Sequence, residues 1–248
     1  MCRTMLPLAA LCGVLALSTD LRADDKAKEV IKQGIAARGG EEKLSKVKGY
    51  REKSKGTISV MGMDIEFSAD SVAAPPTKMK TELKMEIMGM AHNVEVVVNG
   101  DAMRRSIDGM MLAMQDVEKE DAKQRMQVAY VMRLTPLLDE KAFQLKSLAD
   151  AKVDGKDAQV VEITGKDLKE TKFYFDKTTH LLAKVEYEGV GPMGNKGKQE
   201  LQMSEYKDFD GVKQPTKLMI SSDGTKFMEQ SITEYKPLDK VDDKEFAD

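Results

Sequence analysis

Apolar and polar residues alternate along much of this chain. Between 63 and 70, and again between 78 and 87, apolar residues recur at nearly every second position, and charged or small polar residues fill the positions between them. This period of two is typical of antiparallel strands with one buried face and one solvated face. The large apolar residues of these two segments are Ile65, Phe67, Met79, Leu83, Met85 and Ile87.

The same pattern extends over most of the chain, interrupted by short turns such as Asn99-Gly100, Asp108-Gly109 and Asp210-Gly211. Further strands are expected at 57–60, 94–98, up to 107, and at 143–148, 159–163, 171–175, 181–187, 200–206, 216–220 and 226–235. About eleven to thirteen strands without regular strand–helix alternation predict a mainly β fold with helices (α+β), built on one antiparallel sheet. No linker suggests a domain boundary, so one domain is expected over 24–248.

Two segments switch to helical spacing. The first begins at Asp24 and ends at Gly39-Gly40, with its apolar face at Ala27, Val30, Ile31 and Ile35, and a short helical turn with Leu44 and Val47 follows it. The second spans 116–134, begins with acidic residues, continues with basic ones and ends at Pro136. Asp116 is its expected N-cap. Its predicted inward stripe is Val117, Met126, Ala129, Tyr130 and Arg133.

The first 23 residues have the composition of a secretory signal. One basic residue precedes an apolar run at 6–17 that is too short to span a bilayer, and cleavage is expected after Ala23. Leu11 precedes Cys12 where lipidation would require a small residue, so no lipid anchor is expected. Both cysteines would leave with the signal, and the exported domain would depend on its hydrophobic core for stability.

Composition excludes several functions. The chain has 39 basic and 42 acidic residues, and this near balance offers no electrostatic footprint for nucleic acid. Its two histidines, His92 and His180, form neither a zinc pattern nor a Ser-His-Asp arrangement. No glycine-rich phosphate loop is present. We therefore expect no catalytic residue, no metal site and no cofactor, and thus no enzyme.

The hairpin at 206–215, Tyr-Lys-Asp-Phe-Asp-Gly-Val-Lys-Gln-Pro, resembles the signature hairpin of the periplasmic lipoprotein-carrier (LolA/LolB-like) superfamily, in its outer-membrane lipoprotein-sorting branch. The lead-in at 39–47 and the tail at 235–246 resemble the same branch. This resemblance implies a curved half-barrel whose N-terminal and internal helices cover a concave apolar face, where known members hold acyl chains. It also implies a periplasmic location.

The resemblance is incomplete in two places, the helix at 116–134 and the loop at 189–197. In addition, the arginine with which the carriers latch their lid cannot be assigned from the sequence. Its candidates are Arg51, Arg104, Arg105, Arg125 and Arg133.

Methionine is unusually frequent, with 18 residues. Its flexible, polarizable side chain suits a cavity that reshapes around an acyl chain. The predicted hydrophobic ligand cavity consists of Ile65, Phe67, Met79, Leu83, Met85, Ile87, Met126 and Tyr130. Two alternatives are plain core filling and copper(I) binding, for which methionine thioethers are suitable soft ligands.

The sequence thus predicts a periplasmic, non-enzymatic binding or carrier protein for a lipid, a lipoprotein acyl chain or a similar hydrophobic molecule. Envelope membrane proteins are further expected partners. The alternative is a structural or partner-binding envelope domain with a filled core and no ligand.

Overall fold

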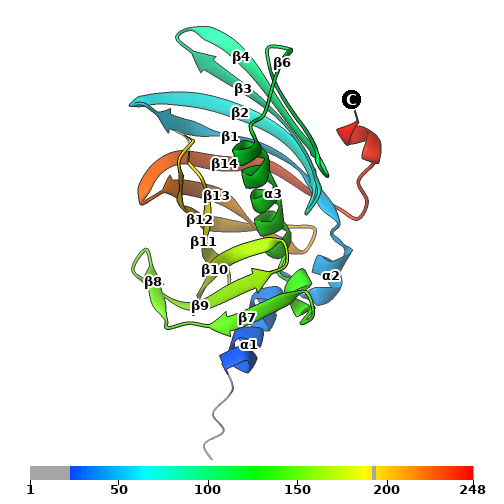
Figure 1. The fold of residues 1–248 in the computed structure, drawn as a ribbon. Helices are drawn as coiled ribbons and strands as arrows, with labels where there is room; N and C mark the ends of the chain where they lie inside the picture. The colour runs from blue at the N-terminus through cyan, green and yellow to red at the C-terminus, as the bar shows by residue number, and fades with distance from the viewer. Residues whose placement is uncertain (1–22, 192–193, 248) are drawn as a thin grey trace, which may run out of the picture.

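The computed structural model describes residues 23–191 and 194–247, and the side chains from Asp25 onward. Residues 1–22 of the predicted signal segment lie outside the described residues. The chain forms one antiparallel sheet of fourteen strands that curves without closing (Figure 1). Its strands are β1 (Gly49–Val60), β2 (Met63–Ala74), β3 (Lys78–Ile87), β4 (Met90–Asn99), β5 (Ala102–Ile107), β6 (Met110–Leu112), β7 (Phe143–Ser147), β8 (Ala151–Val153), β9 (Lys156–Gly165), β10 (Leu168–Asp176), β11 (Leu182–Val190), β12 (Lys196–Phe209), β13 (Val212–Ser222) and β14 (Thr225–Leu238).

The strand order is β6-β5-β4-β3-β2-β1-β14-β13-β12-β11-β10-β9-β7, and β8 pairs with β9. The predicted mainly β, α+β fold with an antiparallel half-barrel sheet is confirmed. Two short strands, β6 and β8, were not predicted, since three residues are too few to show an alternation. The first and last strands, β1 and β14, pair in the middle of the sheet.

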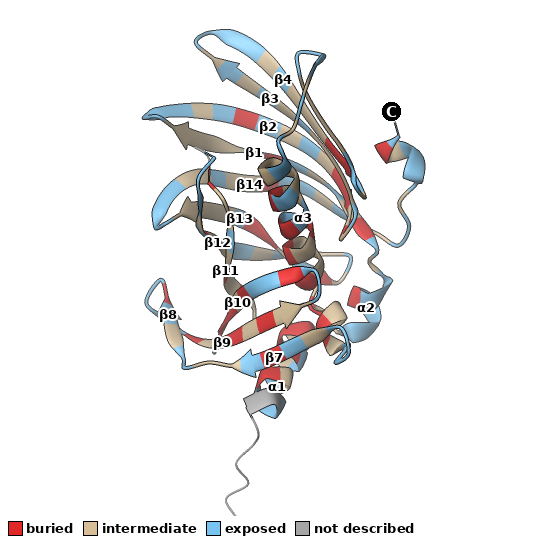
Figure 2. Ribbon diagram, in the orientation of Figure 1, coloured by how far each residue is buried: buried red, intermediate tan, exposed pale blue. Residues whose placement is uncertain are grey.

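Helices cover the concave face of the sheet, as the resemblance implied (Figure 1). They are α1 (Ala23–Ala37), α2 (Glu41–Lys46) and α3 (Asp116–Val131), and the 3-10 helix η1 (Thr135–Leu138) follows α3. A second 3-10 helix, η2 (Asp243–Phe246), belongs to the C-terminal tail. The main core joins Ile31 of α1 and Val131 of α3 to Phe173 and Val185 of the sheet. Figure 2 shows buried residues concentrated on α1, α3, β9 and β10, while the hairpin ends of β1 to β4 are exposed.

The start and the inward stripe of α3 differ from the prediction. Gln115 is the N-cap, and its backbone N–H donates to Glu118 Oε2 at 2.7 Å in a capping box. The buried residues of α3 are Asp121, Gln124, Met126, Val128 and Val131. Asp121 accepts from the Val190 N–H at 2.7 Å, and Gln124 accepts from the Lys169 N–H at 3.3 Å. These two side-chain oxygens accept from backbone donors of the sheet, so polar residues occupy part of the inward face and an apolar pattern could not locate it.

The tail packs against the opposite, convex face. Phe246 in η2 is buried with Val72 and Val97, whose side chains point away from the concave side. Lys78 pairs with Asp243 at 2.6 Å and Arg51 with Glu245 at 2.8 Å. The tail therefore covers β1 to β4 from outside.

Candidate functional site

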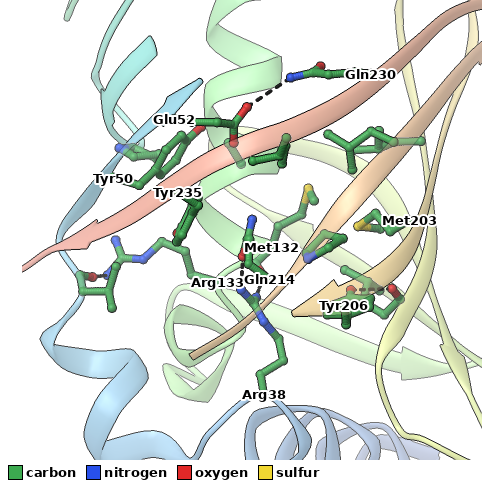
Figure 3. A pocket seen from close by; sticks show the side chains of 18 of the residues that line it. Arg38, Tyr50, Glu52, Met132, Arg133, Met203, Tyr206, Gln214, Gln230 and Tyr235 are labelled. Atoms are coloured by element: carbon green, nitrogen blue, oxygen red, sulfur yellow. Dashed lines mark hydrogen bonds between the residues drawn. The ribbon is translucent and has the colours of Figure 1, made fainter. Parts of the chain in front are cut away.

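A cavity of about 290 Å³ lies between the C-terminal half of α3 and the concave face of the sheet. Residues of β1, β12, β13 and β14 form most of its wall, and Arg38 approaches it from the end of α1 (Figure 3). Its apolar lining consists of Val47, Gly49, Pro75, Ala129, Met132, Leu182, Leu201, Met203, Pro215, Leu218 and Ile232. Its polar lining consists of Arg38, Tyr50, Glu52, Arg133, Tyr206, Gln214, Gln230 and Tyr235.

Two backbone irregularities place wall residues in the cavity. A register shift between β1 and β14 leaves Thr233 as an extra residue, and both Ile232 and Tyr235 then line the cavity, although they are three positions apart. In β12, Glu205 has a φ of +52°, and Met203 and Tyr206 on either side of it also both line the cavity. The hydroxyl of Tyr206 donates to the Leu182 carbonyl at 2.6 Å, which fixes its ring.

Glu52 is the one carboxyl group among the residues that line the cavity. It lies opposite Tyr235 in the β1–β14 register, and its Oε1 accepts a hydrogen bond from Gln230 Nε2 at 3.0 Å. The rings of Tyr50 and Tyr235 stack beside it, with their centroids 5.6 Å apart. Burial raises the pKa of Glu52 to about 7 and that of Tyr235 to about 12. Neutral pH therefore leaves Glu52 partly protonated and Tyr235 neutral.

Arg38, which follows α1, connects the C-terminal ends of α1 and α3 to strand β13. Its Nη1 donates to the Met132 carbonyl at 2.6 Å, its Nε to the Lys213 carbonyl at 3.2 Å, and its Nη2 to Gln214 Oε1 at 2.7 Å. The side chain is buried. Arg38 was not among the five latch candidates, because the sequence gives no sign that the end of α1 meets the end of α3.

Arg133, which follows α3, donates from Nη2 to the Val47 carbonyl and lies 5.7 Å from the Tyr130 ring centroid. Its Nε is buried without a hydrogen-bond partner in the described structure. The other four candidates have their contacts outside this cavity. Arg51, Arg104, Arg105 and Arg125 pair with Glu245, Glu95, Glu118 and Asp121, respectively.

The six predicted cavity residues on β2 and β3 share one face of the sheet, and none of the eight predicted residues lines this cavity. Across the β2–β3 pair, Phe67 lies opposite Met85 and Ala73 opposite Met79, and Ala73 also lies opposite Tyr50. Residues at Ile65, Phe67, Met79, Leu83, Met85 and Ile87 therefore face the same concave side as Tyr50, farther along the sheet. On α3, Met126 is buried, and the Tyr130 ring packs 6.4 Å from that of Phe143.

Sequence reasoning missed most of the lining. Tyr206 and Pro215 belong to the hairpin that carried the resemblance, so they were within reach of that signal. Glu52, Gln230 and Tyr235 belong to segments without a clean alternation, and the bulge in β14 changes which positions point inward.

Met132 and Met203 line the cavity, whereas Met63, Met110 and Met111 are exposed at hairpin ends.

No group of His, Cys, Asp and Glu side chains in the described residues could hold a metal ion. His92 bonds Asp108 at 2.8 Å. Among the described residues, no helix combines the length and apolar character needed to cross a membrane.

Comparison with protein-family models and with curated proteins returns no match for this sequence. Solved structures do match. A LolA superfamily protein from Nitrosomonas europaea is 10% identical, with a TM-score of 0.57, over 90% of this chain and 97% of the other. A DUF1329 family protein from Desulfovibrio piger is 13% identical, with a TM-score of 0.51, over 89% and 97% of the two chains. The fold of this protein is therefore LolA-like.

Proposed function

We propose that this protein is a periplasmic, non-enzymatic binding or carrier protein for a lipid, a lipoprotein acyl chain or a similar hydrophobic ligand. The observation that carries the proposal is the cavity under α3, because its wall is mostly aliphatic and includes Met132 and Met203. Methionine side chains adapt to ligands of variable shape. The volume of about 290 Å³ lies just below the usual range for small-molecule pockets, which is about 300–1,000 Å³.

The position of the cavity supports the same function. The open concave face of β2 and β3, which holds Phe67, Leu83 and Met85, continues from the wall strand β1. A chain longer than the cavity could therefore leave it along an apolar surface. The LolA-like fold gives this arrangement its general architecture.

Filling the cavity tests the proposal. Ala129 lies on α3 and lines the cavity, so Ala129→Phe places a ring in the space that a ligand would occupy. Ala113 is exposed before α3, so Ala113→Phe is the matched control. We expect the unmodified protein and Ala113→Phe to bind an apolar fluorescent probe with similar affinity, and Ala129→Phe to bind it at least about tenfold more weakly, which corresponds to about 1.4 kcal/mol.

The same experiment tests the alternative of a structural or partner-binding domain. The core between α1 and the sheet is closely filled by buried residues, such as Ile31, Leu137, Ile163 and Phe173. If this filling extends to the cavity in solution, the unmodified protein binds no probe, and native mass spectrometry of protein from its own envelope finds no lipid. That pair of results would refute the carrier function.

A further inference from the structure

The cavity contains a guanidinium group whose hydrogen-bonding capacity is mostly unused. Arg133 has five N–H donors, of which Nη2 bonds the Val47 carbonyl, while Nε is buried and has no partner in the described structure. A buried charged donor without a partner costs free energy. Its position on the cavity wall means that a ligand in the cavity could supply the missing acceptor.

A second positive charge lies at the same end of the cavity. Arg38 makes its three side-chain hydrogen bonds to two carbonyl oxygens and an amide oxygen, which are neutral acceptors. Burial lowers the pKa of Arg133, and the charge of Arg38 lowers it further, so the two guanidinium groups act on each other. Figure 3 shows Arg38 extending from the end of α1 to Gln214, with which it forms a hydrogen bond.

No carboxylate neutralises these two charges in the described structure. Glu52 is bonded by Gln230 and forms no ion pair with either arginine. Charges on the convex face behave differently, since Lys184 lies 3.0 Å from Glu186 and Lys80 lies 3.0 Å from Glu95. The chain pairs these convex-face lysines with acids but leaves two arginines without an anion beside an apolar cavity.

We propose that the ligand is an anionic amphiphile, whose carboxylate or phosphate group binds Arg133 and whose apolar chain packs on Met203, Leu218 and Ile232. The planar guanidinium group suits both anions, because it donates two parallel hydrogen bonds to a pair of their oxygens. Arg38 adds its positive charge at the same end. This inference rests on the proposed function and specifies the chemical class of its ligand.

Three probes with twelve carbon atoms each test the inference: dodecanoate, dodecyl phosphate and 1-dodecanol. Their dissociation constants for the purified protein are measured by displacement of the apolar fluorescent probe. We expect at least one anionic probe to bind about tenfold to a hundredfold more tightly than the alcohol, as charge-assisted hydrogen bonds are worth that much. The tighter of the two anions identifies a carboxylate or a phosphate as the preferred group.

Substitutions then assign the effect to Arg133. Arg133→Gln should weaken binding of the preferred anion about tenfold or more and change binding of the alcohol less than about twofold. Arg133→Lys keeps the charge but loses the planar fork of donors. It should bind the preferred anion with an affinity between that of the unmodified protein and that of Arg133→Gln. Arg51→Gln is the control, since Arg51 belongs to β1 but pairs with Glu245 on the convex side. It removes the same charge and should leave all three constants unchanged.

The outcomes separate this inference from the proposed function. If the alcohol binds as tightly as both anions, the protein binds apolar chains and the anionic class is wrong. If Arg133→Gln weakens all three probes equally, Arg133 supports the fold and does not select an anion. If no probe binds, the proposed function fails and this inference fails with it. The comparison of probes on the unmodified protein decides the matter even if Arg133→Gln does not fold.

Discussion

Arg38 Nη1 donates a hydrogen bond of 2.6 Å to the carbonyl oxygen of Met132, and this contact joins the end of α1 to the end of α3. The same guanidinium group reaches the Lys213 carbonyl and Gln214 on β13. One buried side chain thus attaches both covering helices to the second strand of the 206–215 hairpin.

Removing this contact should loosen α3. For Arg38→Gln we expect the free energy of unfolding to fall by about 2 to 4 kcal/mol, because three hydrogen bonds from a charged group are lost and their acceptors remain buried. Denaturant unfolding measures the change, with Arg51→Gln as an exposed control that should cost about 1 kcal/mol or less. Equal losses in the two variants would show that Arg38 holds nothing in place.

Glu52 should make stability depend on pH. Its pKa is raised from 4.5 to about 7 in the folded protein, so the folded state holds its proton more tightly than the unfolded state. The free energy of unfolding should therefore fall as pH rises from 4.5 to about 7, by about 3 kcal/mol in total at 1.36 kcal/mol for each unit. Below pH 4.5 this cost is absent.

Glu52→Gln removes the titration and keeps a polar side chain of similar shape. The difference in unfolding free energy between Glu52→Gln and the unmodified protein should grow in favour of the variant between pH 4.5 and 7 and then level off. Urea unfolding at a series of pH values measures it. A difference that stays constant across this range would mean that Glu52 titrates normally.

Tyr206 should stabilise the hairpin through its hydroxyl group. In Tyr206→Phe the Leu182 carbonyl loses its 2.6 Å donor, and we expect a loss of about 1 to 2 kcal/mol. Tyr130→Phe is a suitable control, because the Tyr130 hydroxyl makes no hydrogen bond in the described structure and its ring packs on Phe143. Thermal or denaturant melts of the two variants compare them directly, and equal stability would contradict the role given to the hydroxyl.

Leu83 distinguishes the open concave face from the filled core. It is only partly buried, opposite Ala69 and Val94, whereas Leu137 is 2% exposed in the main core. Leu137→Ala should cost about 2–5 kcal/mol, and Leu83→Ala should cost clearly less. Leu83→Glu should still fold, and its effect on probe affinity shows whether a bound chain extends over β3. A loss above about 3 kcal/mol for Leu83→Ala would assign this face to the filled core.

Periodicity was sufficient to predict the sheet, both covering helices and the Asp210-Gly211 turn. Asp210 and Gly211 have φ values of 55° and 81°, as a tight hairpin turn requires. The clean alternation of β3 also separated Met79, Leu83 and Met85 from the charged positions between them, and the β2–β3 register places these three on one face of the sheet. These features depend on local residue order, which the sequence displays directly.

The candidate site depends on relations that the sequence does not display. Glu52 and Tyr235 become neighbours only through the pairing of the first and last strands, and the extra residue at Thr233 turns Tyr235 inward. Arg38 meets Met132 because two helices end at the same place. The predicted residues were assigned to a cavity from their face alone, whereas the placement of α3 determines which strands line it.

The pairing of β1 with β14 also has a kinetic consequence. Tyr50 and Glu52 come from the first strand, and Gln230 and Tyr235 come from the last, so no partly synthesised chain can assemble this wall. Contacts so far apart in sequence form late and slowly, since a long loop must close before they are made. Ligand capture should therefore begin only when the whole sheet has formed, and a nascent or truncated chain that lacks β14 should be unable to sequester ligand.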